Sequence, residues 1–312
     1  MAVRRPGRAL TVAGSDSGGG AGIQADLKTF AAYRVYGMSV ITGITAQNTL
    51  GVQAVEAVSP DMVEAQLDSV LSDIGADAVK TGMLANTAIV RAVAGRLAAH
   101  GPLRLVVDPV MMSKSGDPLL DDGAVAALTE LLLPVAECIT PNVPEAERLL
   151  GAPIRTISDM EAAARELADR GPAVVVVKGG HRTLTGPVPR GAVRIGVPAG
   201  ARGVDPRRRA VDVVWEDGKL WYMDGPLFIS RHTHGTGCTF AAAIAAGLAR
   251  GWTRRRAVIE AKHFVTRAIA AAPRLGRGHG PTGHWVVPPA LTRRLADATP
   301  ADRGEVSDGA GS

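Results

Sequence analysis

The sequence predicts an α/β fold in which a mainly parallel β-sheet is covered by helices on both faces. Short runs of β-branched and apolar residues alternate with segments that have the three-and-four spacing of an amphipathic helix. Strands that alternate with helices imply crossover connections, which join parallel strands. The 312 residues include 37 glycines and only 4% aromatic residues, which favours many tight strand-to-helix turns. A single domain is the simplest organisation for a chain of this length.

The first part of the chain predicts a strand, a glycine-rich loop and a helix, followed by two more extended pieces and a second helix. The expected segments are a strand at 9–13, a loop at 14–22, a helix through Asp26, Lys28 and Phe30, strands at 39–46 and 53–58, and a helix from Pro60 to about Ile74. In that second helix Leu67, Val70 and Leu71 recur on one face, as in a helix packed on a core.

The second part repeats the alternation and then departs from it. Strands are expected at 78–80, 105–107, 138–140 and 173–177, helices at 87–99, 123–133 and 144–150, and further helices late in the chain. The Asp217-Gly218 turn between 211–216 and 219–223 predicts a hairpin. Residues 182–211 are rich in Gly, Pro and Arg and predict a mobile surface insertion within a domain at 1–285. The polar, Gly-rich segment at 286–312 is expected to be a disordered tail.

Composition and charge exclude several classes of protein. The formal charge of +5 comes with arginines clustered near the N-terminus and at 202–209, without interleaved aromatic residues, so no nucleic-acid partner is predicted. No run of 18 apolar residues predicts a membrane span. The two cysteines, Cys138 and Cys238, form no CxxC pair, which indicates neither a disulfide framework nor a structural zinc site. A reducing cytoplasm is the expected location.

A glycine-rich stretch near the end of the chain predicts an anion site at a helix start. Gly235, Thr236, Gly237 and Cys238 lead directly into an apolar helical segment. The free N–H groups and the dipole of such a helix start can hold a phosphoryl group. The same dipole would favour the thiolate of Cys238. The alternative is a glycine loop that only lets the helix start close to the sheet.

Polar or glycine-rich clusters follow six of the predicted strands. They are Gly14-Ser15-Asp16, Gln47-Asn48-Thr49, Thr81-Gly82-Met83, Asp108-Pro109-Val110, Pro141-Asn142 and Lys178-Gly179-Gly180. The carboxyl ends of parallel strands share one edge of a sheet, and ligands bind there. Neither a Gly-Lys-Ser/Thr loop nor a GxGxxG loop is present, so a nucleotide would have to bind by another route.

In their order, these motifs resemble those of the hydroxymethylpyrimidine/phosphomethylpyrimidine kinases of thiamine biosynthesis. The resemblance covers about Leu10 to Trp285, through the segments 13–29, 46–49, 80–84, 108–111, 114–117, 140–142, Glu145, 178–181 and 233–238. It implies a ribokinase-like fold and a transferase that uses ATP and Mg²⁺. That kinase phosphorylates 4-amino-5-hydroxymethyl-2-methylpyrimidine and then its monophosphate to the diphosphate. A homodimer is usual in such families.

The resemblance also implies a pocket for the pyrimidine, formed by Gly14, Asp26, Gln47, Met83, Val110 and Cys238. A carboxylate such as Asp26 and an amide such as Gln47 can read the donor and acceptor edge of an aminopyrimidine, while Met83 and Val110 cover the ring. Two of these residues have simpler interpretations. Val110 could be an ordinary core residue, and Asp26 an exposed carboxylate in a first helical turn.

On the nucleotide side the resemblance implies that Lys178, Asn142 and Asp108 bind ATP and that Glu145 organises Mg²⁺. Gly235, Thr236 and Gly237 would hold the migrating phosphoryl group, and Cys238 would act as the base for the first phosphorylation. Glu145 could also be simply a carboxylate in a first helical turn.

Three other functions stay open at this stage. A related kinase could phosphorylate pyridoxal or pyridoxine, and Cys238 beside His232 and His234 could be the nucleophile of a hydrolase. A protein of the same fold could also bind the pyrimidine without turnover. The sequence leaves open the oligomeric state, how strictly pyridoxine is excluded, and whether Asp205 or Asp212 lies near the site.

Overall fold

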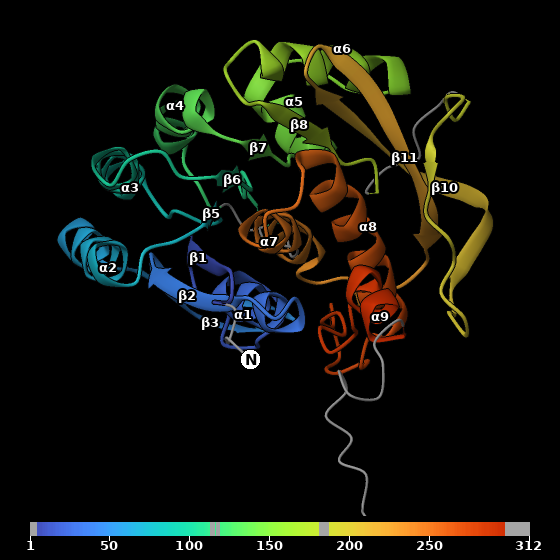
Figure 1. Ribbon diagram of the computed structural model, residues 1–312, viewed down its shortest axis with the longest axis horizontal. Coiled ribbons are helices and arrows are strands. Elements are labelled where there is room, and N and C mark those ends of the chain that lie inside the picture. The colour runs from blue at the N-terminus through green and yellow to red at the C-terminus, as the bar shows by residue number, and fades with distance from the viewer. Residues whose placement is uncertain (1–4, 113–115, 117–118, 181–186, 297–312) are drawn as a thin grey trace, which may run out of the picture.

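A nine-stranded sheet forms the centre of the molecule in a computed structural model that describes residues 5–112, 116, 119–180 and 187–296 (Figure 1). The strand order is β2-β1-β5-β6-β7-β8-β10-β11-β9. Its strands are β1 (Arg8–Ala13), β2 (Tyr36–Ile41), β5 (Ala78–Thr81), β6 (Leu105–Val107), β7 (Cys138–Ile139), β8 (Val174–Val177), β9 (Val193–Arg194), β10 (Val204–Glu216) and β11 (Lys219–Phe228). Neighbouring strands are parallel throughout the part of the sheet formed by β2, β1, β5, β6, β7 and β8. Strand β10 is antiparallel to both of its neighbours, β8 and β11. The predicted fold class is therefore confirmed.

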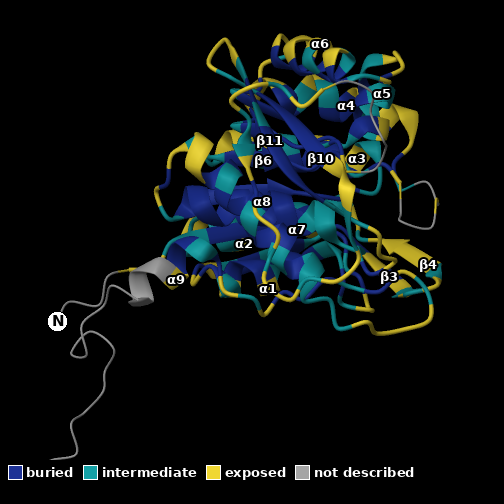
Figure 2. Ribbon diagram, turned by 90° about the vertical axis from the view of Figure 1, so that its right-hand side faces the viewer, coloured by how far each residue is buried: buried dark blue, intermediate teal, exposed yellow. Residues whose placement is uncertain are grey.

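Helices cover both faces of this sheet and create a core on each side (Figures 1 and 2). One core receives α2 (Pro60–Asp73), α3 (Thr87–Ala99), α4 (Asp122–Leu131), α5 (Val143–Leu150) and α6 (Ile157–Ala168). The other receives α1 (Gly22–Ala32), α7 (Thr236–Ala249), α8 (Arg254–Ala270) and α9 (Pro289–Ala296). A 3-10 turn at Leu133–Val135 follows α4. In β1, Leu10 and Val12 face the first core and Ala9 the second, as the two-residue period of a strand requires.

Helix α7 is the most deeply buried helix among those described. Every residue from Thr239 to Ala249 is buried. The helix packs against β1, β5 and β6 on one side and between α1 and α8. Its many alanines allow this close approach, because a larger side chain would separate the helix from the sheet. Among the described residues, no helix is both long and apolar enough to cross a bilayer.

The strand expected at 39–46 is in fact two strands in two different sheets. β2 ends at Ile41, and β3 (Gly43–Asn48) pairs antiparallel with β4 (Gly51–Ala57) in a separate two-stranded sheet. The break comes at Thr42, whose N–H donates to Ala13 O in the main sheet and whose carbonyl accepts from Val58 N. The apolar run continues across the break, so it did not reveal the change of sheet. β4 is largely exposed (Figure 2).

Helix α6 was not predicted, although its start has a clear local signal. Thr156 Oγ1 accepts a hydrogen bond from Asp159 N, and Asp159 Oδ2 accepts one from Thr156 N, which together form a capping box. Helices α2, α3, α4 and α5 agree with their predicted ranges to within one or two residues.

Two predicted boundaries are wrong. The insertion was expected at 182–211, but residues 204–211 belong to β10, and Val193–Arg194 form β9 beside β11. The hairpin turn is where it was predicted, with φ of 49° at Asp217 and 78° at Gly218. The tail was expected at 286–312, but 289–296 form α9, in which Ala290 and Leu291 are buried. Residues 297–312 of the predicted tail, residues 181–186, and the motif residues Lys114, Ser115 and Asp117 lie outside the described residues.

Candidate active site

The predicted polar loops meet at the carboxyl edge of the parallel strands. Gly14, Asp108, Asn142 and Lys178 follow β1, β6, β7 and β8, and Asn142 forms a bridge with Lys178. Gln47 is the exception, because it lies in β3 and not behind a strand of the main sheet. Three of the predicted nucleotide-binding residues are therefore neighbours along this edge.

The glycine-rich start of α7 meets the same edge. Gly235 caps the helix with φ of 79°, and a Cβ atom there would lie 1.8 Å from Gly20 O. A Cβ atom on Gly237 would lie 3.5 Å from Lys178 Nζ and 3.7 Å from Asp108 Oδ2. The first N–H groups of α7 have no partners within the helix. The helix start, an ammonium group and a carboxylate therefore converge on one point.

Asp108 and Lys178 form a buried ion pair at this point. Lys178 Nζ lies 3.3 Å from Asp108 Oδ1, which also accepts a hydrogen bond of 3.1 Å from Thr140 Oγ1. Asp108 is 1% exposed, and its Oδ2 has no hydrogen-bond partner among the described residues. An unpaired buried carboxylate oxygen is costly, which is typical of an atom that meets a ligand.

Glu145 and Asn142 together form a capping box at the start of α5. Asn142 N donates to Glu145 Oε2 at 2.7 Å, and Glu145 N donates to Asn142 Oδ1 at 2.9 Å. The helix-start interpretation of Glu145 is thus confirmed. Burial raises the pKa of Glu145 to about 7, with Asp108 acting in the same direction and Lys178 opposing it. One lone pair of the Asn142 amide oxygen is used in this cap, and its NH₂ group is the donor that it could offer to a nucleotide.

The oxygen donors here fit a magnesium ion. Mg²⁺ prefers one or two carboxylates, and completes its shell with water and substrate phosphates. Asp108 is close enough to Glu145 to help raise the pKa of that carboxyl, and Asp108 offers an unpaired oxygen. Within the described residues no group of three or more His, Cys, Asp or Glu could hold a metal by itself.

Asp26 lies beneath the glycine loop in a fully buried ion pair. Lys80 Nζ lies 2.9 Å from Asp26 Oδ2, which also accepts a hydrogen bond of 2.6 Å from Thr11 Oγ1, and neither charged side chain is exposed. The interpretation of Asp26 as an exposed helical carboxylate is therefore wrong. Its Oδ1 is buried without a hydrogen-bond partner among the described residues, so the carboxylate keeps one acceptor for a ligand.

Cys238 lies in the first turn of α7, as predicted, but its thiol is not activated. Burial raises the pKa of Cys238 to about 11, and nearby Lys80 only partly opposes this. Burial in a low-dielectric environment disfavours the thiolate more than the helix dipole favours it. The predicted low-pKa thiolate is therefore wrong. His234 Nε2 lies 2.8 Å from Asp16 Oδ2 and His232 Nε2 lies 3.4 Å from Arg231 Nε, and no described contact joins either ring to the Cys238 thiol.

Gly14 and Met83 are direct neighbours. Gly14 N donates to Met83 O at 3.1 Å, and a Cβ atom on Gly14 would lie 2.2 Å from Met83 Cε. Glycine is thus required if the methionine is to pack over the loop. Val110 is half-buried after β6 and is not part of either core. This exposure favours the pocket interpretation of Val110 over the core interpretation.

A cavity of about 290 Å³ opens beside the start of α7. Its lining combines apolar side chains, such as Phe228 and Ile269, with Lys178 and Gly237. Asp212 is also in the lining, which answers the question left open by the sequence. Apolar walls next to a cationic group and a helix start suit a base and its phosphates.

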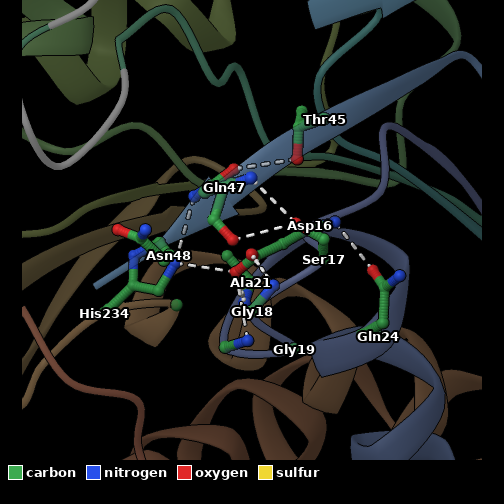
Figure 3. Close-up of polar contacts among 12 residues, drawn as sticks. Asp16, Ser17, Gly18, Gly19, Ala21, Gln24, Thr45, Gln47, Asn48 and His234 are labelled. Carbon is green, nitrogen blue, oxygen red and sulfur yellow. Dashed lines mark hydrogen bonds and ion pairs between the residues drawn. The ribbon is translucent and has the colours of Figure 1, made fainter. Parts of the chain in front are cut away.

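Two contacts at the site, one ion pair and one hydrogen bond between a histidine and a carboxylate, were not predicted from the sequence. Lys262 Nζ of α8 lies 2.6 Å from Asp212 Oδ2 in the wall of this cavity. His234 Nε2 lies 2.8 Å from Asp16 Oδ2, which ties the loop before α7 to the loop after β1 (Figure 3). Both pairs join residues 50 or more positions apart, and no local pattern signals such a contact.

Asp16 organises the glycine loop around itself. Its carboxylate accepts hydrogen bonds from Gly18 N, Gly20 N and Ala21 N at 2.8–3.0 Å (Figure 3). Burial alone would raise the pKa of Asp16, but the bonds from His234 and the backbone amides outweigh it and hold the pKa below its ordinary value. Asp16 is thus an anion at neutral pH.

The family model of phosphomethylpyrimidine kinase matches residues 16–283 of the sequence. This chain belongs to that family. The matched range includes the α7 start, the ion pair of Asp108 with Lys178, and the glycine loop.

Relatives of the same family match most of the chain. The hydroxymethylpyrimidine/phosphomethylpyrimidine kinase of Bacillus subtilis is 43% identical over 278 residues, which are 89% of this chain and 94% of the relative. The Escherichia coli protein of the same name is 45% identical and is covered over 97% of its length. The thiamine biosynthesis bifunctional protein ThiED of Geobacter sulfurreducens is 47% identical, and this chain spans only 52% of its length.

Solved structures confirm the ribokinase-like fold. The phosphomethylpyrimidine kinase of Clostridium difficile matches with a TM-score of 0.69 and 41% identity, over 84% of this chain and 99% of that one. An ADP complex of Bacillus subtilis pyridoxal kinase matches with a TM-score of 0.77 and 37% identity, over 90% of this chain and 98% of that one. A pyridoxal kinase of Staphylococcus aureus matches in complex with AMP-PCP, at 34% identity, a TM-score of 0.77 and 90% coverage of this chain.

Proposed function

We propose that this chain is a bifunctional kinase that phosphorylates the hydroxymethyl group of 4-amino-5-hydroxymethyl-2-methylpyrimidine and then the resulting monophosphate. The observation that carries the proposal is the convergence of Lys178 Nζ and Asp108 Oδ2 on Gly237 at the start of α7. Phosphoryl transfer needs mainly positioned charge, and this point supplies an ammonium group and free backbone N–H groups. Gly14, Met83 and the unpaired oxygen of Asp26 offer the acceptor side of the site.

ATP is the proposed donor. The cavity beside α7 has room and apolar walls for the base, and Lys178 lines it where it meets the helix start. Lys178 would contact phosphate oxygens, and Gly237 would donate its N–H group to the transferred phosphoryl, while Thr236 N already donates to Thr233 O at 3.4 Å. Asp108 and Glu145 would hold Mg²⁺, which neutralises phosphate charge when bound.

The acceptor hydroxyl needs no strong base in this scheme. In a loose transition state the bond to the acceptor forms late, so positioning contributes more than early proton removal. The Cys238 thiol has a pKa raised to about 11 and is protonated at neutral pH. It would therefore contact the acceptor as a neutral group, and the second acceptor is already an ionised phosphate.

One specific observation favours a second candidate, pyridoxal. The solved pyridoxal kinases align with TM-scores of up to 0.77, compared with 0.69 for the solved phosphomethylpyrimidine kinase. A flat pyridine with a hydroxymethyl group would present similar apolar faces to Met83. The relatives named as hydroxymethylpyrimidine/phosphomethylpyrimidine kinases are more similar in sequence, at 43% and 45% identity, so we expect the pyrimidine to be preferred and pyridoxal to compete weakly. A homodimer in the cytoplasm remains a prediction from the sequence.

The test is a coupled measurement of ADP formation with purified protein and Mg-ATP. Separate reactions contain the pyrimidine alcohol, its monophosphate, or pyridoxal. The expected result is ADP formation with each of the two pyrimidines and a lower kcat/KM with pyridoxal. No ADP with either pyrimidine would refute the proposal, and a higher kcat/KM with pyridoxal would favour the second candidate.

A further inference from the structure

A chain of four polar side chains links the glycine loop to Gln47. Asp16 Oδ2 lies 2.8 Å from His234 Nε2, which lies 3.3 Å from Gln47 Nε2 (Figure 3). Gln47 Oε1 lies 3.2 Å from Thr45 Oγ1, and Thr45 Oγ1 lies 2.9 Å from Ser15 O. His234 and Asp16 are nearly buried, with side-chain exposures of 13% and 3%.

The positions of the hydrogens among these side chains follow from which atoms can donate a hydrogen bond and which can only accept one. Asp16 is an anion and can only accept hydrogen bonds, so His234 Nε2 must carry a hydrogen. A protonated ring nitrogen cannot also accept from an amide NH₂ group. At the opposite end, the hydroxyl of Thr45 has a single hydrogen, and Ser15 O can only accept it.

We infer that His234 is a positioning residue that fixes the amide of Gln47 with its oxygen toward the imidazole and its NH₂ group toward Thr45. The Nε2 hydrogen is then shared between the Asp16 carboxylate and the Gln47 amide oxygen. The NH₂ group donates to Thr45 Oγ1, and Thr45 in turn donates to Ser15 O. Each of these contacts then pairs a donor with an acceptor. The assignment with Gln47 Nε2 beside His234 Nε2 would instead place two donors against each other, so the amide oxygen and nitrogen exchange places.

This arrangement sets what Gln47 offers to a ligand, and this step rests on the proposed function. With one end held by His234 and the other by Thr45, the amide keeps one free hydrogen and one free lone pair in a fixed order. An aminopyrimidine edge also has a fixed order of donor and acceptor, so only one amide orientation matches it. His234 therefore contributes to substrate selection without contact with the substrate.

A double-mutant cycle tests the coupling. His234→Ala, Gln47→Ala and the double variant are compared for KM and kcat with the pyrimidine alcohol and with ATP. We expect His234→Ala to raise KM for the pyrimidine about fivefold, the size of one lost neutral hydrogen bond, with a smaller change in KM for ATP. In the Gln47→Ala background the same change should have almost no further effect.

Two further variants separate positioning from folding. His234→Gln keeps an N–H donor, so its KM for the pyrimidine should be close to the wild-type value. This comparison stays informative even if His234→Ala folds poorly. His100→Ala is the matched control, because His100 Nε2 forms a similar bond of 2.9 Å to Asp68 Oδ1 between α3 and α2, remote from this loop. It should leave both KM values unchanged. Additive effects of His234→Ala and Gln47→Ala, or no rescue by His234→Gln, would overturn the inference.

A spectroscopic measurement decides the proton position independently of activity. In ¹⁵N-labelled protein the His234 Nε2 should show the shift of a protonated ring nitrogen, and the Gln47 NH₂ group should show proximity to Thr45. An unprotonated Nε2 would overturn the inference whatever the kinetics show. If the wild type fails to phosphorylate either pyrimidine but Nε2 is protonated, the proposed function fails and the orientation of Gln47 stands.

Discussion

At the scale of single residues, burial decides the chemistry of this site. Lys80 and Asp26 are charged and have no exposed surface, and they persist because each neutralises the other. Burial also raises the pKa of the Cys238 thiol and of the Glu145 carboxyl. The same helix dipole that would activate an exposed cysteine is too weak to offset this loss of solvation.

Replacement of Cys238 by alanine should slow both phosphorylation steps by a similar factor. A thiol with a pKa near 11 is protonated at neutral pH, so its loss removes a packing contact that both acceptors share. The two rates are measured separately with the pyrimidine alcohol and with its monophosphate. A loss confined to the alcohol would show that Cys238 acts as the base after all.

The raised pKa of Glu145 predicts a pH dependence of metal binding. A carboxyl whose pKa is raised to about 7 gains its proton as the pH falls through that value, and a protonated carboxyl is a poor ligand for Mg²⁺. The apparent affinity for Mg²⁺ should therefore increase as the pH rises from about 6 to about 8. The activation constant for Mg²⁺ is measured across this range at saturating ATP.

Glu145→Gln provides the comparison, because an amide does not titrate there. The variant should need a higher Mg²⁺ concentration for half-maximal activity, and this concentration should be nearly independent of pH over the same range. A wild-type constant that does not change with pH would contradict the assignment of Glu145 to the metal.

At the scale of elements, the start of α7 is the critical junction. Gly235 combines φ of 79° with a contact so close that a Cβ atom would lie 1.8 Å from Gly20 O. The loop after β1 can approach the helix only because that side chain is absent. The free N–H groups of α7 thereby come to lie next to Lys178 and Asp108.

Gly235→Ala should therefore destabilise the protein and abolish most activity. Its matched control is Gly251→Ala at the other end of α7, where φ is 77° but no atom lies within 4 Å of the added Cβ. Gly251→Ala should lower the free energy of unfolding by only about 1–2 kcal/mol, the cost of placing an L-residue in a left-handed backbone conformation. It should leave kcat unchanged. Thermal unfolding and kcat are measured for both, and equal losses would refute a role for the contact with Gly20.

At the scale of the whole molecule, one sheet carries two cores, and the site lies where loops from both sides meet. Helices α2 to α6 cover one face and α1, α7, α8 and α9 the other. The loops that follow the parallel strands lie at one edge of the sheet. Residues more than 100 positions apart, such as Asp108 and Gly237, are therefore neighbours. The sheet continues through β10 and β11, which extend the cavity wall beyond the parallel strands.

The C-terminal boundary can be tested by truncation. Ala290 N donates to the buried Glu260 Oε2 of α8, and Leu291 is 5% exposed, so α9 is part of the folded unit. A chain that ends after Ala296 should keep the melting temperature and activity of the full protein. A chain that ends after Pro288 should melt at a lower temperature, because it loses this contact and exposes apolar surface of α8. Equal melting temperatures would show that α9 contributes no stability.

The main features of the fold could be read from periodicity and turn residues. The parallel strands, most of the helices and the Asp217-Gly218 hairpin depend on local patterns, and these patterns are confirmed. The features that the sequence did not predict depend on contacts between segments far apart in the chain. The transfer of the chain between sheets at Thr42 and the extension of β10 to Val204 depend on hydrogen bonds to distant segments.

The sequence by itself determined the alternation of strands and helices, and with it the edge at which Asp108, Asn142 and Lys178 gather. It also placed Cys238 in the first turn of α7. Only the tertiary structure decided that the thiol is protonated, that Asp26 is paired with Lys80, and that Asp16 meets His234. The reason is physical: periodicity is a property of neighbouring residues, whereas solvation and charge pairing depend on what the folded chain brings close from elsewhere.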